Sequence, residues 1–388
     1  MTDVSALEAR LDHPARRTLA WAGPALFGLL GVLGAVNRWV APIGLGSVVD
    51  GSLLALLLPI VLLASLALAV EFGIGDSDHP TWKRSVAASG AGLLGGVLLV
   101  AAWGKLLDPQ AFSESIAAEG LDFVLPAMVI AVIAVGIEVG LGAALVLGLR
   151  RLWLLGASSL LVLFFLFLTG RAYWRFAHGI VDETSSCGCF GSLIERTPAE
   201  AFWQDLILLA PGLVLAYLVV DRSSASGRRL AVAAAVTLLA VGLAVAAPSL
   251  PLDDFATRLH PGVEMTEICS GSGDARICLS SLNPELLDGE HVVLLTRIDD
   301  PVFIESVEDL NSFFLEPDLP GLVVLSTATA EELQTFFWQF GPSFEIAETP
   351  EPMMRPLYRT LPRSFLVADG RVEETFEGMP PLASLRAR

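Results

Sequence analysis

Charged residues are scarce in this chain: Asp, Glu, Lys and Arg make up only 17% of its 388 residues, and lysine occurs twice. Soluble domains seldom have so few charges, which excludes an ordinary soluble protein. The hydrophobic residues, 54% of the total, form blocks near the ~20 residues that a bilayer crossing requires. The sequence therefore predicts an α-helical polytopic membrane protein with about seven spans. These spans are expected at residues 18–36, 52–71, 86–103, 124–147, 152–169, 202–220 and 230–248.

Several functional signatures are also missing. No phosphate-binding loop of the Gly-x-x-x-x-Gly-Lys-Ser/Thr type occurs, and the five histidines are scattered without a pair at metal-ligand spacing. We therefore expect no nucleotide site and no metal site built on histidines. No small-residue cleavage site follows the first apolar block, so this block is expected to be a span rather than a secretory signal.

The basic residues beside the spans predict the orientation. Ten Lys and Arg lie in the N-terminal segment and in the loops predicted on the same side of the membrane. Five lie in the loops predicted on the opposite side. By the positive-inside rule, the N-terminus is cytoplasmic and the chain after about residue 249 is extracytoplasmic, which fits a cell inner membrane. All four cysteines then face the outer side, where disulfides persist.

The segment after residue 249 is strongly acidic. It holds 24 Asp and Glu against nine Arg and no Lys, and so carries most of the net charge of −18. Such a domain disfavours nucleic acid and anionic lipid as partners. We expect no nucleic-acid partner, whereas the lipid bilayer is a partner of the apolar part.

Cys187 and Cys189, with Gly188 between them, stand in a loop between two predicted spans. A disulfide needs Cα atoms roughly 4.4–6.8 Å apart, which residues two apart reach only with a bent backbone that glycine permits. Such a bond is easily reduced, which favours thiol exchange. Metal binding, a passive bridge and spare thiols remain open as alternatives.

Two charged residues stand out in the apolar background. Glu138 lies in mid-span, where a lone carboxylate costs at least ~2.5 kcal/mol, so it is expected to face the bundle interior and to be protonated or paired. It is either a packing residue or a proton or quinone-site group. Lys105 ends the third span, where it either anchors the helix at the water interface or lowers the pKa of a loop thiol. Asp108, before Pro109, is expected to cap a helix.

Four sequence features together resemble the MauE branch of the DoxX-like membrane proteins over residues 86–220. They are Gly104 to Pro109, Glu138 with the glycines after it, the basic turn at Arg150 and Arg151, and Ser186 to Gly191. The resemblance implies a four-helix, redox-associated membrane module. It also implies a link to methylamine utilisation, in which the disulfides of methylamine dehydrogenase must form correctly.

The chain adds other parts to this module, which gives four predicted domains. Residues 1–85 hold two transmembrane helices, 86–220 the MauE/DoxX-like domain, 221–260 the seventh helix and a linker, and 261–388 an extracytoplasmic domain. In the last domain, strand patterns at 291–298, 322–326, 363–368 and 372–377 and helix patterns at 303–314 and 330–340 predict a small α/β sheet.

This order resembles the thioredoxin-like fold. Thr360 to Gly370 looks like the segment that carries the cis-proline of that fold, which makes Pro362 the cis-proline candidate. The Cys-Pro-x-Cys of that family then falls on Asp300 to Phe303, so both of its cysteines are lost. The resemblance therefore implies a domain without the usual thioredoxin chemistry.

Cys269 and Cys278 flank a predicted hairpin before this sheet, and we expect them to form a stapling disulfide. In the chain-entropy model, a disulfide that closes a loop of this size stabilises the folded domain by roughly 2–3 kcal/mol. The alternative is a relay in which this pair trades oxidation state with Cys187 and Cys189.

The sequence as a whole predicts a membrane thiol–disulfide exchange or maturation factor, with an exported or periplasmic protein as its client. Cys187 and Cys189 would exchange, Lys105 would favour the thiolate, and Glu138 would couple to a membrane acceptor such as a quinone. The alternative is a non-enzymatic membrane assembly or scaffold protein whose cysteines are structural.

Overall fold

The computed structural model describes residues 51–73, 80–180, 197–220, 227–270 and 277–387. The chain divides into two compact units, residues 1–248 and 249–388, which we call the membrane unit and the C-terminal unit. The first predicted span, Cys187 and Cys189 lie outside the described residues.

The described part of the membrane unit is helical, and its helices match the second to seventh predicted spans. Five helices, α4, α6, α7, α8 and α9, are long and apolar enough to cross a membrane among the residues described, and α3 adds a shorter apolar stretch. This confirms a multi-pass membrane protein. The helices are α3 (Gly51–Gly73), α4 (Thr81–Leu107), the short α5 (Pro109–Ala118), α6 (Ala127–Val146), α7 (Leu152–Ala177), α8 (Pro198–Ala216) and α9 (Gly227–Ala246).

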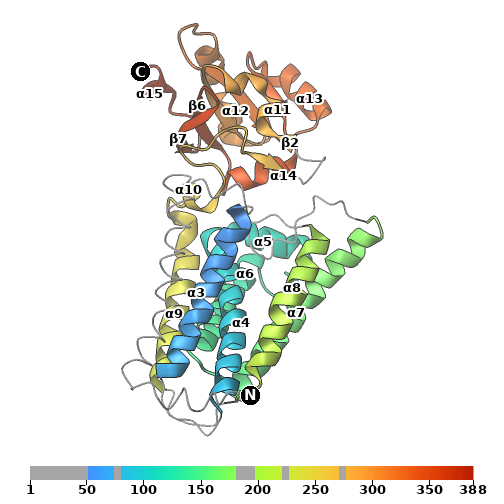
Figure 1. Ribbon diagram of the computed structural model, residues 1–388. Helices are drawn as coiled ribbons and strands as arrows, with labels where there is room; N and C mark the ends of the chain where they lie inside the picture. The colour runs from blue at the N-terminus through green and yellow to red at the C-terminus, as the bar shows by residue number, and fades with distance from the viewer. Residues whose placement is uncertain (1–50, 74–79, 181–196, 221–226, 271–276, 388) are drawn as a thin grey trace. The chain divides into compact units, whose positions relative to one another are not determined.

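Helix α4 is central in the bundle and packs against α3, α6 and α8, while α7 packs mainly on α8 and α9 on α6 (Figure 1). Glycines bring these helices together. A Cβ atom on Gly95 would lie 2.7 Å from the carbonyl oxygen of Gly142, and one on Gly90 would lie 2.8 Å from that of Gly212. The small residues therefore allow α4 to approach α6 and α8 closely, as expected for helices in lipid.

Gly148 differs in its role from these packing glycines. Its φ angle is +70°, in the left-handed region that favours glycine, and it follows the end of α6. Gly148 ends the helix, and its carbonyl accepts a 3.3 Å hydrogen bond from Arg229 at the start of α9.

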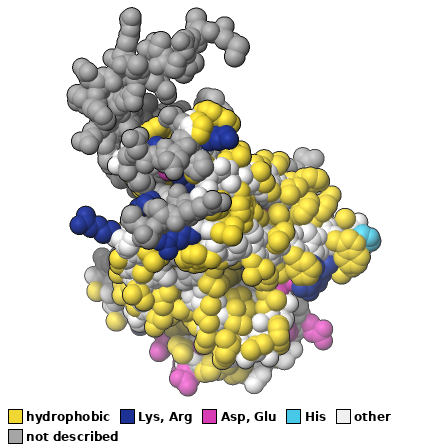
Figure 2. All heavy atoms as spheres, turned by 90° about the horizontal axis from the view of Figure 1, so that it is seen from below, with side chains coloured by type: hydrophobic (Ala, Val, Ile, Leu, Met, Phe, Trp, Pro, Cys, Tyr) yellow, Lys and Arg dark blue, Asp and Glu magenta, His cyan; other side chains and the backbone are white. Residues whose placement is uncertain are grey.

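Many large apolar side chains of the membrane unit face outward. Leu160 on α7 and Leu239 on α9 are more than 70% exposed, as expected for side chains that contact lipid. Figure 2 shows hydrophobic side chains over much of the face that it views, with few charged groups among them. The bilayer is therefore a partner of this unit.

The C-terminal unit is built on a five-stranded sheet with the order β5-β4-β3-β6-β7. Strands β3, β4 and β5 are parallel, and β6 and β7 are antiparallel to their neighbours. The helix α12 (Pro301–Phe314) joins β3 to β4, and α13 (Ala330–Phe340) joins β4 to β5. This is a thioredoxin-like arrangement. The strands are β3 (Glu290–Leu295), β4 (Gly321–Ser326), β5 (Glu345–Glu348), β6 (Arg363–Ala368) and β7 (Arg371–Glu377).

The alternation of side chains along the strands builds a core on each face of the sheet. Val292 and Leu294 of β3 pack with Phe303 of α12 and Phe336 of α13 on one face. Val293 and Leu295 pack on the other face with buried residues from shorter segments. These segments include α11 (Leu279–Leu282), η5 (Pro284–Leu287), α14 (Glu351–Met354) and η6 (Arg355–Leu357). The unit also contains α10 (Asp253–Ala256), β1 (Cys269–Ser270), β2 (Ile277–Cys278) and α15 (Leu382–Leu385).

The structure differs from the sequence-based outline in two places. The C-terminal unit begins at residue 249 rather than 261, because hydrogen bonds tie the backbone at Leu250 and Leu259 to Arg359 and Arg363. Strand β5 was not predicted. It is a four-residue edge strand whose outer positions are glutamates, so its apolar pattern is too short to stand out.

Candidate functional site

The membrane unit contains a buried ion pair between two helices. Nζ of Lys105, in the last turn of α4, lies 2.5 Å from Oε1 of Glu138, near the middle of α6. Both side chains are only 1% exposed. Glu138 thus faces the bundle interior and has a charged partner, as its position in mid-span requires.

Of the two alternatives for Lys105, the anchor at the water interface does not fit the structure, because the side chain is covered. Asp108 caps α5 by accepting a 2.9 Å hydrogen bond from the amide of Ala111, and α5 brings Phe112 to the lysine. The ammonium lies 4.9 Å from the centre of the Phe112 ring and 5.1 Å from that of Phe165 on α7. Both distances suit cation–π contacts.

A third ionisable residue lies near this pair and was missed by sequence reasoning. Asp205 of α8 is 4% exposed and lines a small void together with Lys105 and Phe165. Asp205 falls in the predicted sixth span, so a lone acid in an apolar block was the available signal. Helices α4, α6 and α8 thus each bring one ionisable side chain to the same region of the bundle.

A large cavity adjoins the Lys105–Glu138 pair. Its volume is about 990 Å³, and its lining is mostly apolar. It is lined by residues of α5, α6, α7 and α9 as well as by Lys105. The volume lies at the upper end of the range for small-molecule sites.

A second buried ion-pair cluster lies where α3 ends and α4 begins. Glu71 accepts hydrogen bonds from Arg84, at 2.8 Å, and from Arg150, at 2.7 Å. Arg150 is 1% exposed. Sequence reasoning used both arginines to predict orientation, and Arg150 also as part of the MauE resemblance, but it did not single out Glu71. The cluster joins three segments of the bundle and has a structural role.

The segment with Cys187 and Cys189 connects α7 to α8, and the structure describes it only up to Ile180 and from Thr197. The last turns of α7 lie near the end of α5, because Arg171 of α7 forms a 3.0 Å ion pair with Glu119, the residue that follows α5. The connection therefore leaves the bundle on the same side as the α4–α5 turn beside Lys105.

The comparisons with known proteins bear on this unit. Residues 83–218 match the family model of the methylamine utilisation protein MauE. The match spans α4 to α8, the Lys105–Glu138 pair and the Cys187–Cys189 segment. The membrane unit is therefore MauE-like, as the sequence motifs predicted. No curated protein sequence matches the chain.

Chains of solved structures also match this chain. One of them is in a crystal structure of a candidate thiol:disulfide interchange protein DsbE from Chlorobium tepidum, with 18% identity and a TM-score of 0.26. The similarity covers 33% of this chain and 92% of that one. At this TM-score the likeness adds nothing to what the strand order shows.

The thioredoxin-like unit lacks cysteines at the start of its first helix. Asp300 caps α12 and accepts a 2.8 Å hydrogen bond from the amide of Val302, and Phe303 is buried in the core. The motif expected at these positions, Cys-Pro-x-Cys, is thus replaced by a helix cap and a core residue. This helix start cannot exchange disulfides.

Cys269 and Cys278 are joined by a disulfide in the structure. They stand directly opposite each other in the short β1–β2 pair. The bond therefore closes the hairpin, which is the stapling arrangement expected from the sequence. The alternative relay involves Cys187 and Cys189, which lie outside the described residues.

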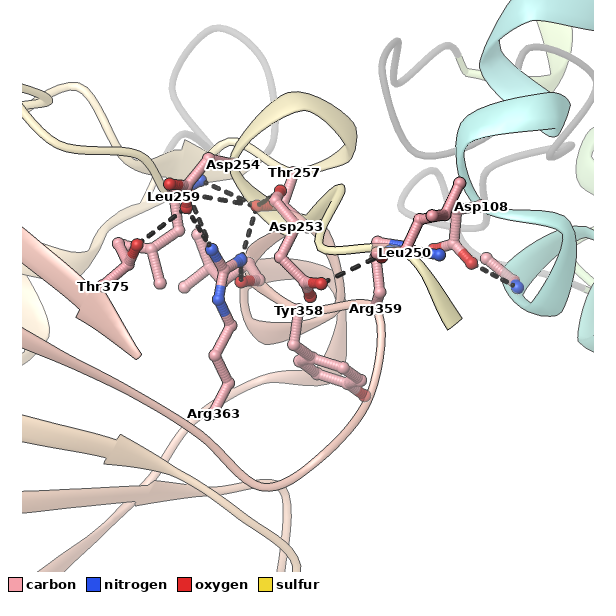
Figure 3. A network of polar contacts seen from close by, with 12 residues as sticks. Asp108, Leu250, Asp253, Asp254, Thr257, Leu259, Tyr358, Arg359, Arg363 and Thr375 are labelled. Carbon is pink, nitrogen blue, oxygen red and sulfur yellow. Dashed lines mark hydrogen bonds and ion pairs between the residues drawn. The ribbon is translucent and has the colours of Figure 1, made fainter. Parts of the chain in front are cut away.

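The Leu361–Pro362 peptide bond is cis and directly precedes β6. The next residue, Arg363, is 1% exposed and lies at the centre of the network in Figure 3. It donates to Thr257 Oγ1 at 2.6 Å and to the carbonyl oxygen of Leu357 at 2.7 Å, and pairs with Asp254 at 2.8 Å. Burial lowers the pKa of the Arg363 guanidinium, which nearby Asp253 and Asp254 oppose. The network ties the start of the unit to its cis-proline segment.

A groove of about 470 Å³ lies between the start of α12 and helix α13. Ile304 and Phe336 contribute apolar surface, and Asp299 and Glu332 contribute acidic groups. A hydrogen bond from Arg297 lowers the pKa of the Asp299 carboxyl, and hydrogen bonds from Thr329 lower that of Glu332. Both acids therefore remain charged to lower pH than usual.

Proposed function

We propose that this protein is a membrane thiol–disulfide exchange factor for the maturation of exported proteins. Cys187 and Cys189 form the exchanging pair, at the extracytoplasmic face of the cell inner membrane. The observation that carries the proposal is the position of this pair: it falls within the MauE-like match, on the connection between α7 and α8.

The charged groups of the bundle support this assignment by their place in the fold. The α7–α8 connection leaves the bundle on the side of the α4–α5 turn, where the buried Lys105 lies. A cation near a thiol stabilises the thiolate, which is the attacking species in exchange. Because Lys105 is paired with Glu138, its effect on the cysteines depends on the state of that carboxyl.

The C-terminal unit serves as the client-holding part in this proposal. It retains the thioredoxin-like sheet and the cis-Pro362 but has lost both thiols at the start of α12. Its groove combines apolar and acidic side chains, which suits an unfolded client segment with basic and apolar residues. The exported client and the link to methylamine utilisation follow from the MauE resemblance.

A second candidate function is that of a membrane assembly or scaffold protein. The loss of the thioredoxin cysteines and the stapling role of Cys269 and Cys278 favour it. In that case Cys187 and Cys189 would be structural, and the protein would hold a client without changing its disulfides.

Trapping of mixed disulfides separates the two functions. In exchange, the attacking thiol forms a covalent bond to the client that the second thiol then resolves. We expect one of the variants Cys187→Ser and Cys189→Ser to accumulate a mixed disulfide with an exported protein, identified by non-reducing gels and mass spectrometry.

The matched control is the double variant Cys269→Ser/Cys278→Ser, which keeps the loop pair and loses only the staple. We expect it to retain exchange. If neither single variant traps a client, and replacing both loop cysteines leaves client disulfides unchanged, the scaffold function holds instead.

A further inference from the structure

The cavity beside the Lys105–Glu138 pair has the features of a lipid-soluble ligand site. Its volume of about 990 Å³ is enclosed by the apolar faces of α6, α7 and α9. Ile133 and Ile137 of α6 and Phe164 of α7 line it and are also 43–47% exposed. On helices that cross a membrane, such side chains face lipid, so a ligand can enter the cavity from the bilayer.

The fully buried ionisable groups that line this cavity are Lys105 and Glu138, whereas Ser115, Glu119 and Thr237 of the same lining are partly exposed. Glu138 Oε2 is buried and has no hydrogen-bond partner among the described residues, although Oε1 of the same carboxyl is bound by Lys105. A buried polar atom without a partner costs free energy, which a ligand that donates a hydrogen bond would recover. The Lys105 ammonium has two further N–H groups and lines the same cavity.

The charge of the pair restricts the ligand. Lys105 and Glu138, the two buried charges that line the cavity, neutralise each other, and Asp205 is not part of this lining. A ligand with a net charge would therefore find no counter-ion at the pair in a medium of low dielectric constant. A neutral head group that both accepts and donates hydrogen bonds fits this pair. The apolar walls fit a hydrocarbon tail.

We infer that this cavity binds an isoprenoid quinone and its quinol. A quinone carbonyl would accept a hydrogen bond from Lys105 Nζ, and a quinol hydroxyl would donate one to Glu138 Oε2. The ring and the first units of the tail would lie among the apolar side chains of α6, α7 and α9.

This inference rests on the proposed function, which requires an electron acceptor. Oxidation of two thiols to a disulfide releases two electrons and two protons. Reduction of a quinone to a quinol consumes two electrons and two protons, so the two half-reactions balance. A quinone held in the membrane unit would therefore reoxidise the loop pair.

The test uses a substitution that fills part of the cavity and leaves Lys105 and Glu138 unchanged. Ala234 and Ala235 are neighbours on α9 and both are exposed, but only Ala234 lines the cavity. The full chain, with Cys187→Ser and Cys189→Ser to prevent redox chemistry, is placed in nanodiscs and titrated with decylubiquinone. Trp153 also lines the cavity, so quenching of its fluorescence reports binding. The variant Trp153→Phe shows how much of the total quenching comes from this residue.

We expect Ala234→Phe to weaken decylubiquinone binding by at least about tenfold and Ala235→Phe to leave it within about twofold. The double variant Lys105→Met/Glu138→Leu removes both polar groups without leaving a single buried charge, and should also weaken binding by about tenfold. A competing neutral lipid, dioleoylglycerol, should displace the quinone poorly.

Three results would overturn the inference: no saturable binding by the parent chain, equal binding by the two alanine variants, or equal competition by dioleoylglycerol. Because the cysteines are absent from this assay, its failure leaves the proposed exchange untouched. Conversely, quinone binding without any trapped client would overturn the exchange function alone.

Discussion

The Lys105–Glu138 pair illustrates how a charged side chain is accommodated inside a membrane bundle. Either group alone would cost at least ~2.5 kcal/mol in mid-membrane, and removal of one partner from a buried pair leaves the other charge uncompensated. Together they form a neutral unit that is 1% exposed, with Phe112 and Phe165 beside the ammonium. The two residues should therefore be energetically coupled.

A double-mutant cycle tests this coupling. We expect Glu138→Gln to destabilise the protein by about 3–5 kcal/mol, because Lys105 then remains buried without its counter-ion. The double variant Lys105→Met/Glu138→Leu should recover most of this loss. Thermal denaturation of the full chain in detergent measures the stability of each variant. Equal melting temperatures for the single and double variants would show that the pair is not coupled.

Arg363 is the corresponding buried charge in the C-terminal unit. We expect Arg363→Met to destabilise this unit by about 2–4 kcal/mol, since the carbonyl groups of Leu357 and Leu259 would lose their donors. The measurement is hydrogen exchange in the peptide 249–260. The control is Arg297→Met, a 63% exposed arginine whose loss should leave exchange unchanged. Slow exchange in Arg363→Met would contradict the anchoring role.

The sequence predicted part of this residue-level picture. A glutamate in mid-span must face the interior, and that expectation follows from charge alone. The partner was not predicted, because Lys105 stands at a span end, where lysines usually reach water. Only the fold shows that α5, which begins at Asp108-Pro109, turns back and covers it. The signal that was available is that Lys105 and Glu138 are opposite charges in otherwise apolar segments.

Among the helices, the close approach of α4 and α6 decides where the Lys105–Glu138 pair can form. We expect Gly95→Ala to destabilise the bundle by about 1–3 kcal/mol, because its Cβ would lie 2.7 Å from the Gly142 carbonyl oxygen. Gly156→Ala in α7 is the control, since nothing lies within 4 Å of that Cβ. Thermal denaturation in detergent compares them, and an equal effect of the two would exclude a tight α4–α6 contact.

Helix α13 gives a pH-dependent prediction. Thr329 and Glu332 form a capping box in which the Thr329 amide and hydroxyl hold the Glu332 carboxylate, and these bonds lower its pKa. A lowered folded-state pKa means that the stabilisation is present above the unfolded value of about 4.3 and is lost as the pH falls through the folded pKa.

We therefore expect Glu332→Gln to fray the first turn of α13 at about pH 7 and to match the parent chain at about pH 3. Hydrogen exchange of residues 330–340, corrected for the intrinsic pH dependence of the rate, measures this difference. A difference that persists unchanged at low pH would show that the charge of Glu332 does not stabilise the helix.

Most elements were predictable because their patterns are strong. Apolar blocks of span length identified α4 and α6 to α9, and buried runs between turn residues identified β3, β4 and β6. The edge strand β5 was missed because two of its four residues are glutamates. Packing partners were not predictable, since the glycines of α4 contact three different helices and the sequence does not say which.

In the protein as a whole, each of the two units has a separate role in the proposed thiol–disulfide exchange. The membrane unit is MauE-like and places its ionisable side chains between helices beside a lipid-accessible cavity. The C-terminal unit has the thioredoxin-like sheet without thiols and carries most of the acidic charge. Under this account the only cysteines that exchange are Cys187 and Cys189.

The redox state of Cys187 and Cys189 in intact cells is the decisive measurement. In the Cys269→Ser/Cys278→Ser background these two are the only remaining cysteines, so a mass-tagged maleimide counts their free thiols on a gel. The account predicts that a membrane-impermeant reductant exposes both thiols within minutes and that they become oxidised again when it is removed. Thiols that remain free throughout, or that react only after the membrane is permeabilised, would contradict it.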